Sequence, residues 1–337
     1  MENILIRHSD TFTNLHINRP SNLNSLSNDM VHSLRQGLNT DQRIIFTGEG
    51  RSFCAGGDIL SLVTGSTKPS DFFRNEFRLF YEISCLKQET VAVLDGITMG
   101  GGVGLSMACK YRVLTGKTLW AMPETAIGFF PDVGASFFLN KLTNEPLGLY
   151  MGLTGARLNG VDSYFAGVSE YYAETLDDRK KGLIFTKGLE GITSFCHSPD
   201  SLKSELLKDL PLITHCFDSN FTVEEIIARL MTANNDWSRK TVGILNEMSP
   251  LSLKITREMN NRGKILSYFD SLELEYDLCV KVTEVENANF VNSITHKLIN
   301  KSKTPVQWLP GSLAEISDSR ISSLFSTFNN RLYTPAL

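Results

Sequence analysis

The chain has 337 residues, of which 42% are hydrophobic and 21% charged, and its formal net charge is -4. This length and composition fit one large α/β domain with an appended helical part. The acidic balance argues against a nucleic-acid binder, which would carry a basic field. No apolar run reaches the roughly 20 residues that a membrane span needs. The N-terminus shows neither a secretory nor a transit pattern, so we expect a cytoplasmic protein.

Six cysteines lie far apart along the chain, with no Cys-x-x-Cys pair, and we interpret them as reduced thiols. The pairs Cys196-His197 and His215-Cys216 offer four zinc-ligand types, but their spacing fits no common zinc site. The alternative is that these four residues are ordinary buried and surface side chains. We therefore expect no metal.

The first part of the chain alternates strand and helix patterns. A strand is expected at residues 15–18, followed by a helix with Ser27 as its N-cap. Short buried strands are expected at residues 43–47 (RIIFT) and 91–94 (VAVL), each followed by a glycine-bearing turn. Strands that alternate with helices predict an α/β core.

The second part of the chain is predicted to be helical. From about residue 223 onward, apolar residues recur at helical spacing, for example Leu266, Phe269, Leu272 and Tyr276. The sequence between about residues 173 and 220 is poorly patterned. We place a boundary there, with a first domain over residues 1–190 and a helical C-terminal region over residues 191–337.

Two glycine-rich turns can present backbone N–H groups, at residues 51–58 (RSFCAGGD) and 99–104 (MGGGVG). Backbone N–H groups stabilise the oxyanion that forms when a thioester carbonyl is attacked, and glycine lets the substrate approach them. The second turn precedes a predicted helix at residues 103–108, whose dipole would favour the same oxygen. The alternative for each turn is a tight connection with close packing.

Two carboxylates stand in an otherwise apolar or small stretch at residues 122–134 (MPETAIGFFPDVG), namely Glu124 and Asp132. Apolar surroundings raise the pKa of a carboxyl group, which suits proton transfer near neutral pH. The alternative is that Asp132 caps a helix starting near Val133, while Glu124 is a solvated turn residue.

A third carboxylate, Glu76, lies in a predicted helix at residues 70–83. It shares the apolar face of this helix with Phe72, Leu79 and Ile83. An ionisable group on a core-facing stripe needs a partner or a ligand. The alternative is a glutamate paired with arginine or folded outward.

Together these segments resemble the crotonase (enoyl-CoA hydratase/isomerase) superfamily and, within it, most closely the 3-hydroxyisobutyryl-CoA hydrolases. The resemblance is close from about residue 15 to 170 and looser beyond. It is carried by NRP (18–20), LNSL (23–26), FCAGGDI (53–59), DFFRNEF (71–77), GITMGGGVGLS (96–106), AMPETAIGFFPDVGASFFL (121–139), LTG (153–155), SPLSLK (249–254) and PVQW (305–308).

The resemblance implies an α/β fold, a spiral of ββα units with a C-terminal helical region, and an acyl-CoA site in the first domain. The implied activity is hydrolysis of a short 3-hydroxyacyl-CoA thioester, above all 3-hydroxyisobutyryl-CoA in valine breakdown. Carried over by motif, the N–H groups of Gly57 and Gly101 would form the oxyanion hole. Glu124 and Asp132 would be the catalytic carboxylates.

Further residues would contact the substrate. The resemblance implies that Glu76 and Gly101 bind the acyl part and that Arg51 lies near the CoA adenine or phosphate. No cofactor is expected, since CoA belongs to the substrate. The expected partner is an acyl-CoA, with no nucleic acid and no membrane, and a homo-oligomer is left open.

Two departures from the family pattern bear on the activity. Hydratases of this family carry a second glutamate where this chain has Gly104, and its second carboxylate is instead Asp132, so hydrolysis fits better than hydration. At residues 289–295 (NFVNSIT) the chain lacks the acidic pair, the glycine and the arginine that the hydrolases usually show. An enoyl-CoA hydratase or isomerase, or a non-catalytic binding or structural subunit, is the alternative.

Overall fold

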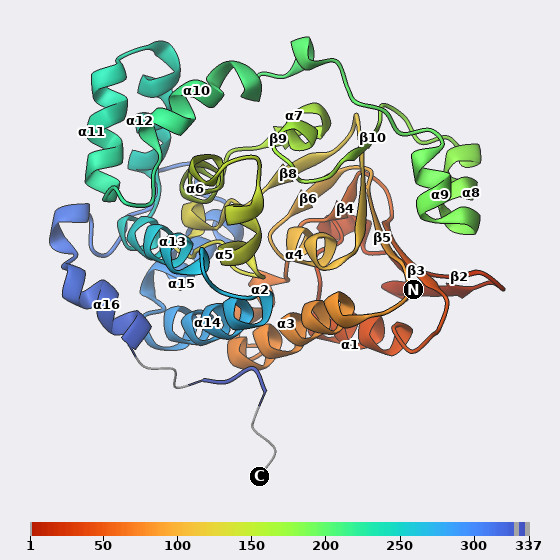
Figure 1. Cartoon of the computed structure of the whole chain (residues 1–337). Helices are drawn as coiled ribbons and strands as arrows, with labels where there is room; N and C mark the ends of the chain where they lie inside the picture. The colour runs from red at the N-terminus through yellow and green to blue at the C-terminus, as the bar shows by residue number, and fades with distance from the viewer. Residues whose placement is uncertain (1, 327–329, 334–337) are drawn as a thin grey trace. The chain divides into compact units, whose positions relative to one another are not determined.

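The computed structural model describes residues 2–326 and 330–333 (Figure 1). The chain forms two compact units that interleave along the sequence, so no single boundary separates them. The predicted domain boundary at residue 190 stays a prediction. Unit 1 contains the residues up to 58 together with 78–121 and 157–208, and unit 2 contains 59–77, 122–156 and the residues from 209 onward.

Unit 1 contains two sheets. The larger has the strand order β1-β2-β3-β5-β7-β10, and the smaller has the order β4-β6-β8-β9. Within these sheets β1 pairs antiparallel with β2 and β8 with β9, and all the other pairs are parallel. The strands are β1 (Ile4–His8), β2 (Phe12–Ile17), β3 (Arg43–Gly48), β4 (Ser52–Cys54), β5 (Thr90–Leu94), β6 (Ile97–Met99), β7 (Tyr111–Thr115), β8 (Leu119–Ala121), β9 (Leu158–Asn159) and β10 (Tyr171–Ala173).

Consecutive strands of unit 1 divide between the two sheets. The first members of the pairs β3/β4, β5/β6 and β7/β8 join the larger sheet, and the second members join the smaller one. The third element of such a repeat is a helix, as when α4 (Gly101–Ala108) follows β5 and β6 (Figure 1). This arrangement confirms the expected fold of repeated ββα units.

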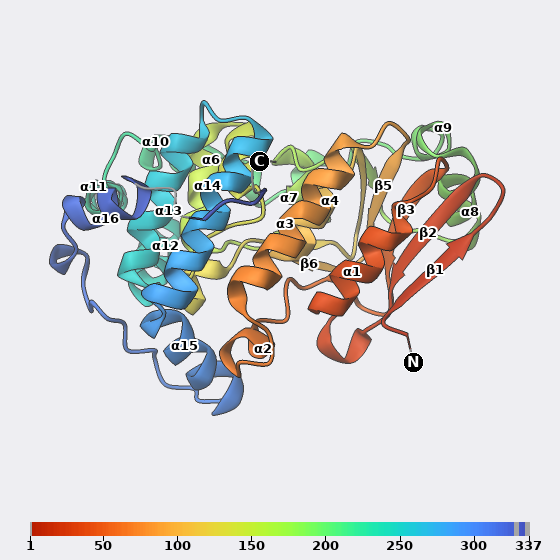
Figure 2. The ribbon, with the colours of Figure 1, turned by 90° about the horizontal axis from the view of Figure 1, so that it is seen from below.

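The predicted elements of unit 1 are found close to their expected positions. Strands β3 and β5 carry apolar runs because parallel strands are covered on both faces. The expected strand at 15–18 belongs to the longer β2. Ser27 caps α1 (Asn28–Gly37), since its hydroxyl accepts a hydrogen bond of 3.3 Å from the N–H of Met30. Figure 2 shows α1 beside β1 and β2.

The poorly patterned stretch after residue 173 is helical as well. Helices α8 (Asp178–Lys187) and α9 (Leu189–Thr193) supply Ile184 and Ile192 to the core of unit 1. Each of these helices is short and buries few side chains, so its apolar residues are too sparse to show a helical period. Their apolar partners on the sheet are Ile45, Val91, Val93 and Val113.

Unit 2 is built from helices. Two helices, α3 (Pro69–Cys85) and α10 (Leu206–Cys216), run through both units, and α7 (Gly160–Phe165) belongs to unit 1. The π-helical turns Lys281–Val285 and Thr295–Ile299 extend α14 and α15. The helices of unit 2 are α2 (Ile59–Val63), α5 (Ala135–Phe138), α6 (Glu145–Thr154), α11 (Val223–Ala233), α12 (Asp236–Glu247), α13 (Pro250–Gly263), α14 (Tyr268–Val280), α15 (Ala288–Ile294) and α16 (Asp318–Ser326).

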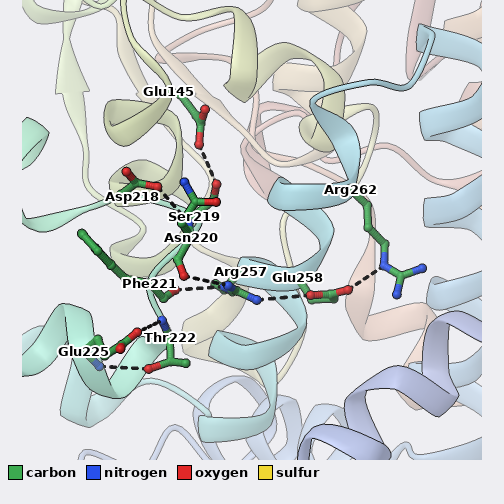
Figure 3. A network of polar contacts seen from close by, with 10 residues as sticks. All are labelled: Glu145, Asp218, Ser219, Asn220, Phe221, Thr222, Glu225, Arg257, Glu258 and Arg262. Atoms are coloured by element: carbon green, nitrogen blue, oxygen red, sulfur yellow. Dashed lines mark hydrogen bonds and ion pairs between the residues drawn. The ribbon is translucent and has the colours of Figure 1, made fainter.

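Helix α13 is the centre of unit 2, where it packs against α5, α6, α11 and α16. It also fastens the loop that precedes α11 (Figure 3). The guanidinium of Arg257 donates to the carbonyls of Phe221, at 2.9 Å, and Asn220, at 3.3 Å. The loop ends in a capping box, in which Thr222 and Glu225 each accept the other's backbone N–H. None of the helices in the described part of the chain is long and apolar enough to cross a bilayer.

Candidate active site

In unit 1, the N–H of Gly57 points away from the strand-like pairing of its neighbours. Leu26 donates to the carbonyl of Gly56 and accepts from the N–H of Asp58, both at 2.8 Å. This pattern is a parallel bridge between Leu26 and Gly57. Alternate residues of an extended chain point their N–H groups to opposite sides, so the N–H of Gly57 faces the side opposite Leu26.

The second glycine turn lies beside the first. Helix α4 begins at Gly101, and the first N–H groups of a helix have no intrahelical acceptor. Its amide nitrogen lies 3.5 Å from the position that a Cβ at Gly56 would take. Close packing explains Gly102, where a Cβ would come within 2.0 Å of the Cys54 carbonyl oxygen, and a positive φ of 50° explains Gly100. Unit 1 therefore brings the turns of Gly57 and Gly101 together.

In unit 2, Glu124 begins a 3₁₀ turn (η2, Glu124–Ile127) and is buried, with 7% of its surface exposed. Its Oε2 has no hydrogen-bond partner among the described residues. The turn is fixed from several sides, because the Thr125 hydroxyl donates to the Leu153 carbonyl at 3.1 Å and the Ser293 hydroxyl to the Ile127 carbonyl at 2.6 Å. The alternative of a solvated turn residue is wrong.

Asp132 lies in the turn before α5 and is 5% exposed. The N-cap of α5 is Gly134, without a side-chain hydrogen bond, so Asp132 is not a helix cap. Its backbone carbonyl takes part in the turn and accepts the N–H of Ala135 at 3.0 Å. The Asp132 carboxyl lies near Cys279, whose Sγ is 3.8 Å from Oδ2.

Glu76 lies on α3 and is 2% exposed, and its helical neighbours Phe72, Leu79 and Ile83 are buried as predicted. The glutamate is thus not folded outward. Its Oε1 has no hydrogen-bond partner, and no ion pair joins it to an arginine, within the residues that the structure describes. A buried polar oxygen without a partner is costly, which leaves Glu76 as a group that a ligand could satisfy.

Four carboxyl groups of unit 2 are linked electrostatically through Asp132, namely Glu76, Glu124, Asp132 and Glu275, which we call the carboxyl cluster. Burial raises the pKa of Glu76 and of Glu124 well above the usual value, and the negative charge of Asp132 adds to it. Burial and then the charge of Glu275 raise the pKa of Asp132, and burial raises the pKa of Glu275 to about 7.

The surroundings of the cluster explain these shifts. Its neighbours include a group of aromatic rings, in which Phe129 stacks on Phe73 at 5.6 Å and contacts Phe290 at 5.5 Å between centroids. No lysine, arginine or histidine of the described chain is among the groups that act on the four pKa values. Since like charges in an apolar site cannot all ionise, the cluster holds protons near neutral pH, as general acid–base chemistry requires.

Sequence reasoning missed Glu275 and its helical neighbour Cys279. The available signal was the run LELEYDLCV at residues 272–280, in which acidic residues alternate with apolar ones. Every residue of this run is buried, so α14 places its acidic side chains inside unit 2. An acidic residue in a helix that is buried on all sides needs a partner inside the protein.

Two other predicted features have a less specific outcome. Arg51 lies on an exposed turn of unit 1 between β3 and β4, where its carbonyl accepts the Ile97 N–H at 3.2 Å, and its contact with CoA stays a prediction. No group of three or more His, Cys, Asp or Glu side chains that could hold a metal ion lies in residues 2–326 or 330–333. All six cysteines are free thiols.

Comparison with known proteins adds independent information. A family model described as "Enoyl-CoA hydratase/isomerase" matches residues 12–325. The mitochondrial 3-hydroxyisobutyryl-CoA hydrolase of Rattus norvegicus is 35% identical over 94% of this chain and 86% of that protein. The Homo sapiens protein of the same name is 34% identical over 98% and 90%, and 3-hydroxyisobutyryl-CoA hydrolase 1 of Arabidopsis thaliana is 32% identical over 96% and 91%.

Solved structures share the whole fold. A carnitinyl-CoA dehydratase from Mycobacterium thermoresistibile superposes with a TM-score of 0.90 at 29% identity, covering 99% of both chains. An enoyl-CoA hydratase from Rhodobacter sphaeroides 2.4.1 has a TM-score of 0.85 at 30% identity, covering 96% of this chain and 97% of the other. The similar proteins thus include both hydrolases and hydratases by name, and the carboxyl cluster must distinguish the two reactions.

Proposed function

The chain belongs to the enoyl-CoA hydratase/isomerase family, and from that premise we propose that it hydrolyses the thioester of 3-hydroxyisobutyryl-CoA, as in valine breakdown. The observation that carries the choice of reaction is the buried pair Glu124 and Asp132, which interact electrostatically in an apolar site. The position where hydratases of the family carry their second glutamate is Gly104, inside α4. A single residue without a side chain cannot supply the second acid–base group of hydration.

In the proposed mechanism the thioester carbonyl oxygen accepts the N–H groups of Gly57 and Gly101. These donors stabilise the negative charge that develops on this oxygen when the carbonyl carbon is attacked. Their adjacent turns and the position of Gly101 at the start of α4 support this role.

Glu124 acts on the carbonyl carbon in its ionised form, either by adding to it or by taking a proton from the water that adds. Its raised pKa makes the ionised carboxylate a stronger base than an exposed one. Asp132 stays protonated to a higher pH than usual, because burial and the charge of Glu275 raise its pKa. In the reaction it gives this proton to the departing sulfur. When water adds, a C–O bond forms and the C–S bond breaks, which gives the free acid and CoA as a thiol, and the proton that Glu124 took from the water returns to Asp132. When Glu124 itself adds, the thiol leaves an acyl–Glu124 anhydride, which a water then splits into the free acid and the Glu124 carboxylate, and a proton again returns to Asp132.

Glu76 supplies the selectivity for the hydroxylated acyl group. Its unpartnered Oε1 would accept the hydrogen bond of the 3-hydroxyl, while Arg51 on the exposed turn of unit 1 would bind the CoA moiety. We propose that no metal or redox cofactor takes part, because the carboxyl groups and backbone N–H groups supply every proton and charge that hydrolysis needs.

The compartment of the protein stays a prediction. The cytoplasm is the expectation from the sequence, whereas the animal relatives are named as mitochondrial proteins. Fractionation of the source cells, followed by detection of this chain with an antibody, distinguishes the two compartments.

The test of the proposed function is the release of free thiol from 3-hydroxyisobutyryl-CoA, followed with a thiol reagent. A parallel assay follows the loss of the conjugated double bond of an enoyl-CoA. Because Cys85 is exposed and reacts with the reagent, the enzyme is titrated without substrate first. Thiol release from the hydroxylated substrate supports hydrolysis. Loss of the double bond without thiol release would identify a hydratase, and inactivity in both assays would identify a non-catalytic protein.

A further inference from the structure

Three hydrogen bonds join Glu275 to Gly134 and Ser136, which follow Asp132 where α5 begins. Its Oε2 accepts the N–H of Gly134 at 2.5 Å. Its Oε1 accepts the N–H of Ser136 at 2.7 Å and the hydroxyl of Ser136 at 2.6 Å. The side chain is fully buried in α14. Its carboxylate therefore accepts N–H groups at the start of α5, as an N-cap side chain usually does, although it comes from another helix.

The turn itself requires such a support. Val133 has a φ of +60° and Gly134 a φ of +92°, so two left-handed residues follow Asp132 directly. A β-branched residue in this region is strained by about 1–3 kcal/mol and persists only where the surroundings fix it. Gly134 also packs on α14, since a Cβ there would come within 2.5 Å of the Tyr268 ring.

We propose that Glu275 is a positioning residue for the reaction. It holds the turn of Val133 and Gly134, and it thereby fixes the position of the Asp132 carboxyl group and keeps that group protonated. The inference rests on the proposed hydrolase function. Helix α14 presents Glu275 and Cys279 four residues apart on the face that meets Asp132.

The charge of Glu275 supports the same role as its hydrogen bonds. The pKa of Asp132 responds to the charge of Glu275 and to a hydrogen bond from Cys279, both from α14. The charge of Asp132 acts in turn on Glu76 from α3 and Glu124 from η2. The charge of Glu275 raises the pKa of Asp132. Above its pKa of about 7, the ionised Glu275, which accepts three hydrogen bonds, therefore favours the protonated form of Asp132.

The substitution Glu275→Gln tests this role at nearly constant volume. The amide nitrogen must face either Gly134 or Ser136, so at least one N–H of the turn meets another donor. We expect kcat to fall by about 10²-fold, the effect of a small misplacement of a reacting group, with KM almost unchanged. In an Asp132→Asn background the same substitution should change kcat by less than about threefold, because residues that act through one group are not additive.

Two control variants separate positioning from general stability. Ser136→Ala removes one of the three hydrogen bonds but keeps both backbone ones, so kcat should fall much less than in Glu275→Gln. Glu273→Gln removes a buried carboxylate from the same helix, where Glu273 accepts the N–H groups of Leu332, at 3.1 Å, and Tyr333, at 3.3 Å. This variant should lower Tm but leave kcat unchanged.

A readout without turnover distinguishes failure of this inference from failure of the proposed function. The carboxyl carbon of Asp132, observed by ¹³C NMR and assigned with Asp132→Asn, should titrate at a lower pH in Glu275→Gln, because a neighbouring negative charge is gone. A wild-type protein without thioesterase activity would overturn the proposed function, and the titration then decides on Glu275. An unshifted titration, or equal losses of kcat in both backgrounds, overturns the inference.

Discussion

Glu124 is a single carboxylate whose loss can be tested at constant shape. Glu124→Gln removes its charge and its proton, while the side chain keeps its length within the fixed turn η2. We expect kcat for thioester hydrolysis to fall by about 10²–10⁴-fold, the usual contribution of a general acid or base. Thiol release under saturating substrate measures the effect. A folded variant that turns over at the wild-type rate would remove Glu124 from the mechanism.

Glu76 can be tested with a pair of substrates that differ by one hydroxyl group. A site with a buried acceptor rejects the analogue that lacks the donor, by up to about 10⁴–10⁵-fold in kcat/KM. The wild-type protein should therefore strongly prefer 3-hydroxyisobutyryl-CoA over isobutyryl-CoA, and Glu76→Ala should flatten this preference. Measuring both thioesters with both proteins checks it. A lowered Tm with an unchanged preference would show that Glu76 only supports the fold.

The residues of the cluster differ in how visible they are in the sequence. Glu124 and Asp132 stand out because they interrupt an apolar motif, and the face of a helix identifies Glu76. Glu275 does not stand out, because its three hydrogen bonds go to a turn 141 and 139 residues away in the sequence. Such a partner is known only once the fold brings α14 and the turn together.

At the level of elements, the capping box of α11 provides a stability test away from the carboxyl cluster. Thr222→Ala removes the hydroxyl that accepts the Glu225 N–H at 3.1 Å (Figure 3). The free energy of unfolding should fall by about 1 kcal/mol, as for other N-cap threonines. Urea denaturation measures this change, and kcat should not respond.

The matched control for this variant is Thr232→Ala on the same helix. The Thr232 hydroxyl bonds to the Ala228 carbonyl at 2.9 Å inside α11 and caps nothing. Alanine has the higher helix propensity, so this variant should be as stable as the wild type or slightly more stable. Equal losses in Thr222→Ala and Thr232→Ala would mean that the cap contributes nothing specific.

The divergent segment at residues 289–295 has a clear structural role. Asn289 donates to the carbonyl of Leu309 and accepts its N–H, both at 2.8 Å, which an ionised aspartate could not do because it has no donor. The Ser293 hydroxyl donates to the Ile127 carbonyl in the turn of Glu124, at 2.6 Å. The segment therefore holds the Glu124 turn through Ser293 and the loop at Leu309 through Asn289.

Elements were predictable where a pattern was long enough. Local signals predicted the strands β3 and β5 and the N-cap Ser27, because a buried strand and a helix cap are both recognised from residues that are close in the sequence. Strands of three residues, such as β4 and β6, have no measurable period. Leu266 shares the helical spacing of Phe269, Leu272 and Tyr276 but lies outside α14, which starts at Tyr268 because Ser267 caps it.

For the whole molecule, the carboxyl cluster predicts an unusual dependence of stability on pH. A carboxyl group with a raised pKa holds its proton in the folded state after the unfolded state has lost it. For Glu275 this window runs from about pH 4.3, the usual pKa of glutamate, to about 7. The stabilising effect is thus complete at the acidic end and is lost as pH rises through the window.

Glu124→Gln isolates one group of this cluster. It removes a titrating carboxyl, so the variant should gain stability relative to the wild type as pH rises above about 4.3. Denaturation curves of both proteins at several pH values between 4.5 and 8 measure the difference. Parallel stability curves would mean that Glu124 ionises as readily in the folded state as in the unfolded state.

The same cluster also bears on how the reaction ends. The acyl group enters as a neutral thioester and leaves as an acid that ionises in water. Hydrolysis therefore creates an anion next to carboxyl groups whose pKa values respond to no cation among the described residues. Repulsion between like charges is strong where water is excluded. Expulsion of 3-hydroxyisobutyrate should therefore be fast, and the reverse reaction disfavoured. Inhibition constants should show the acid as a weak product inhibitor that strengthens toward pH 5, with free CoA the stronger one.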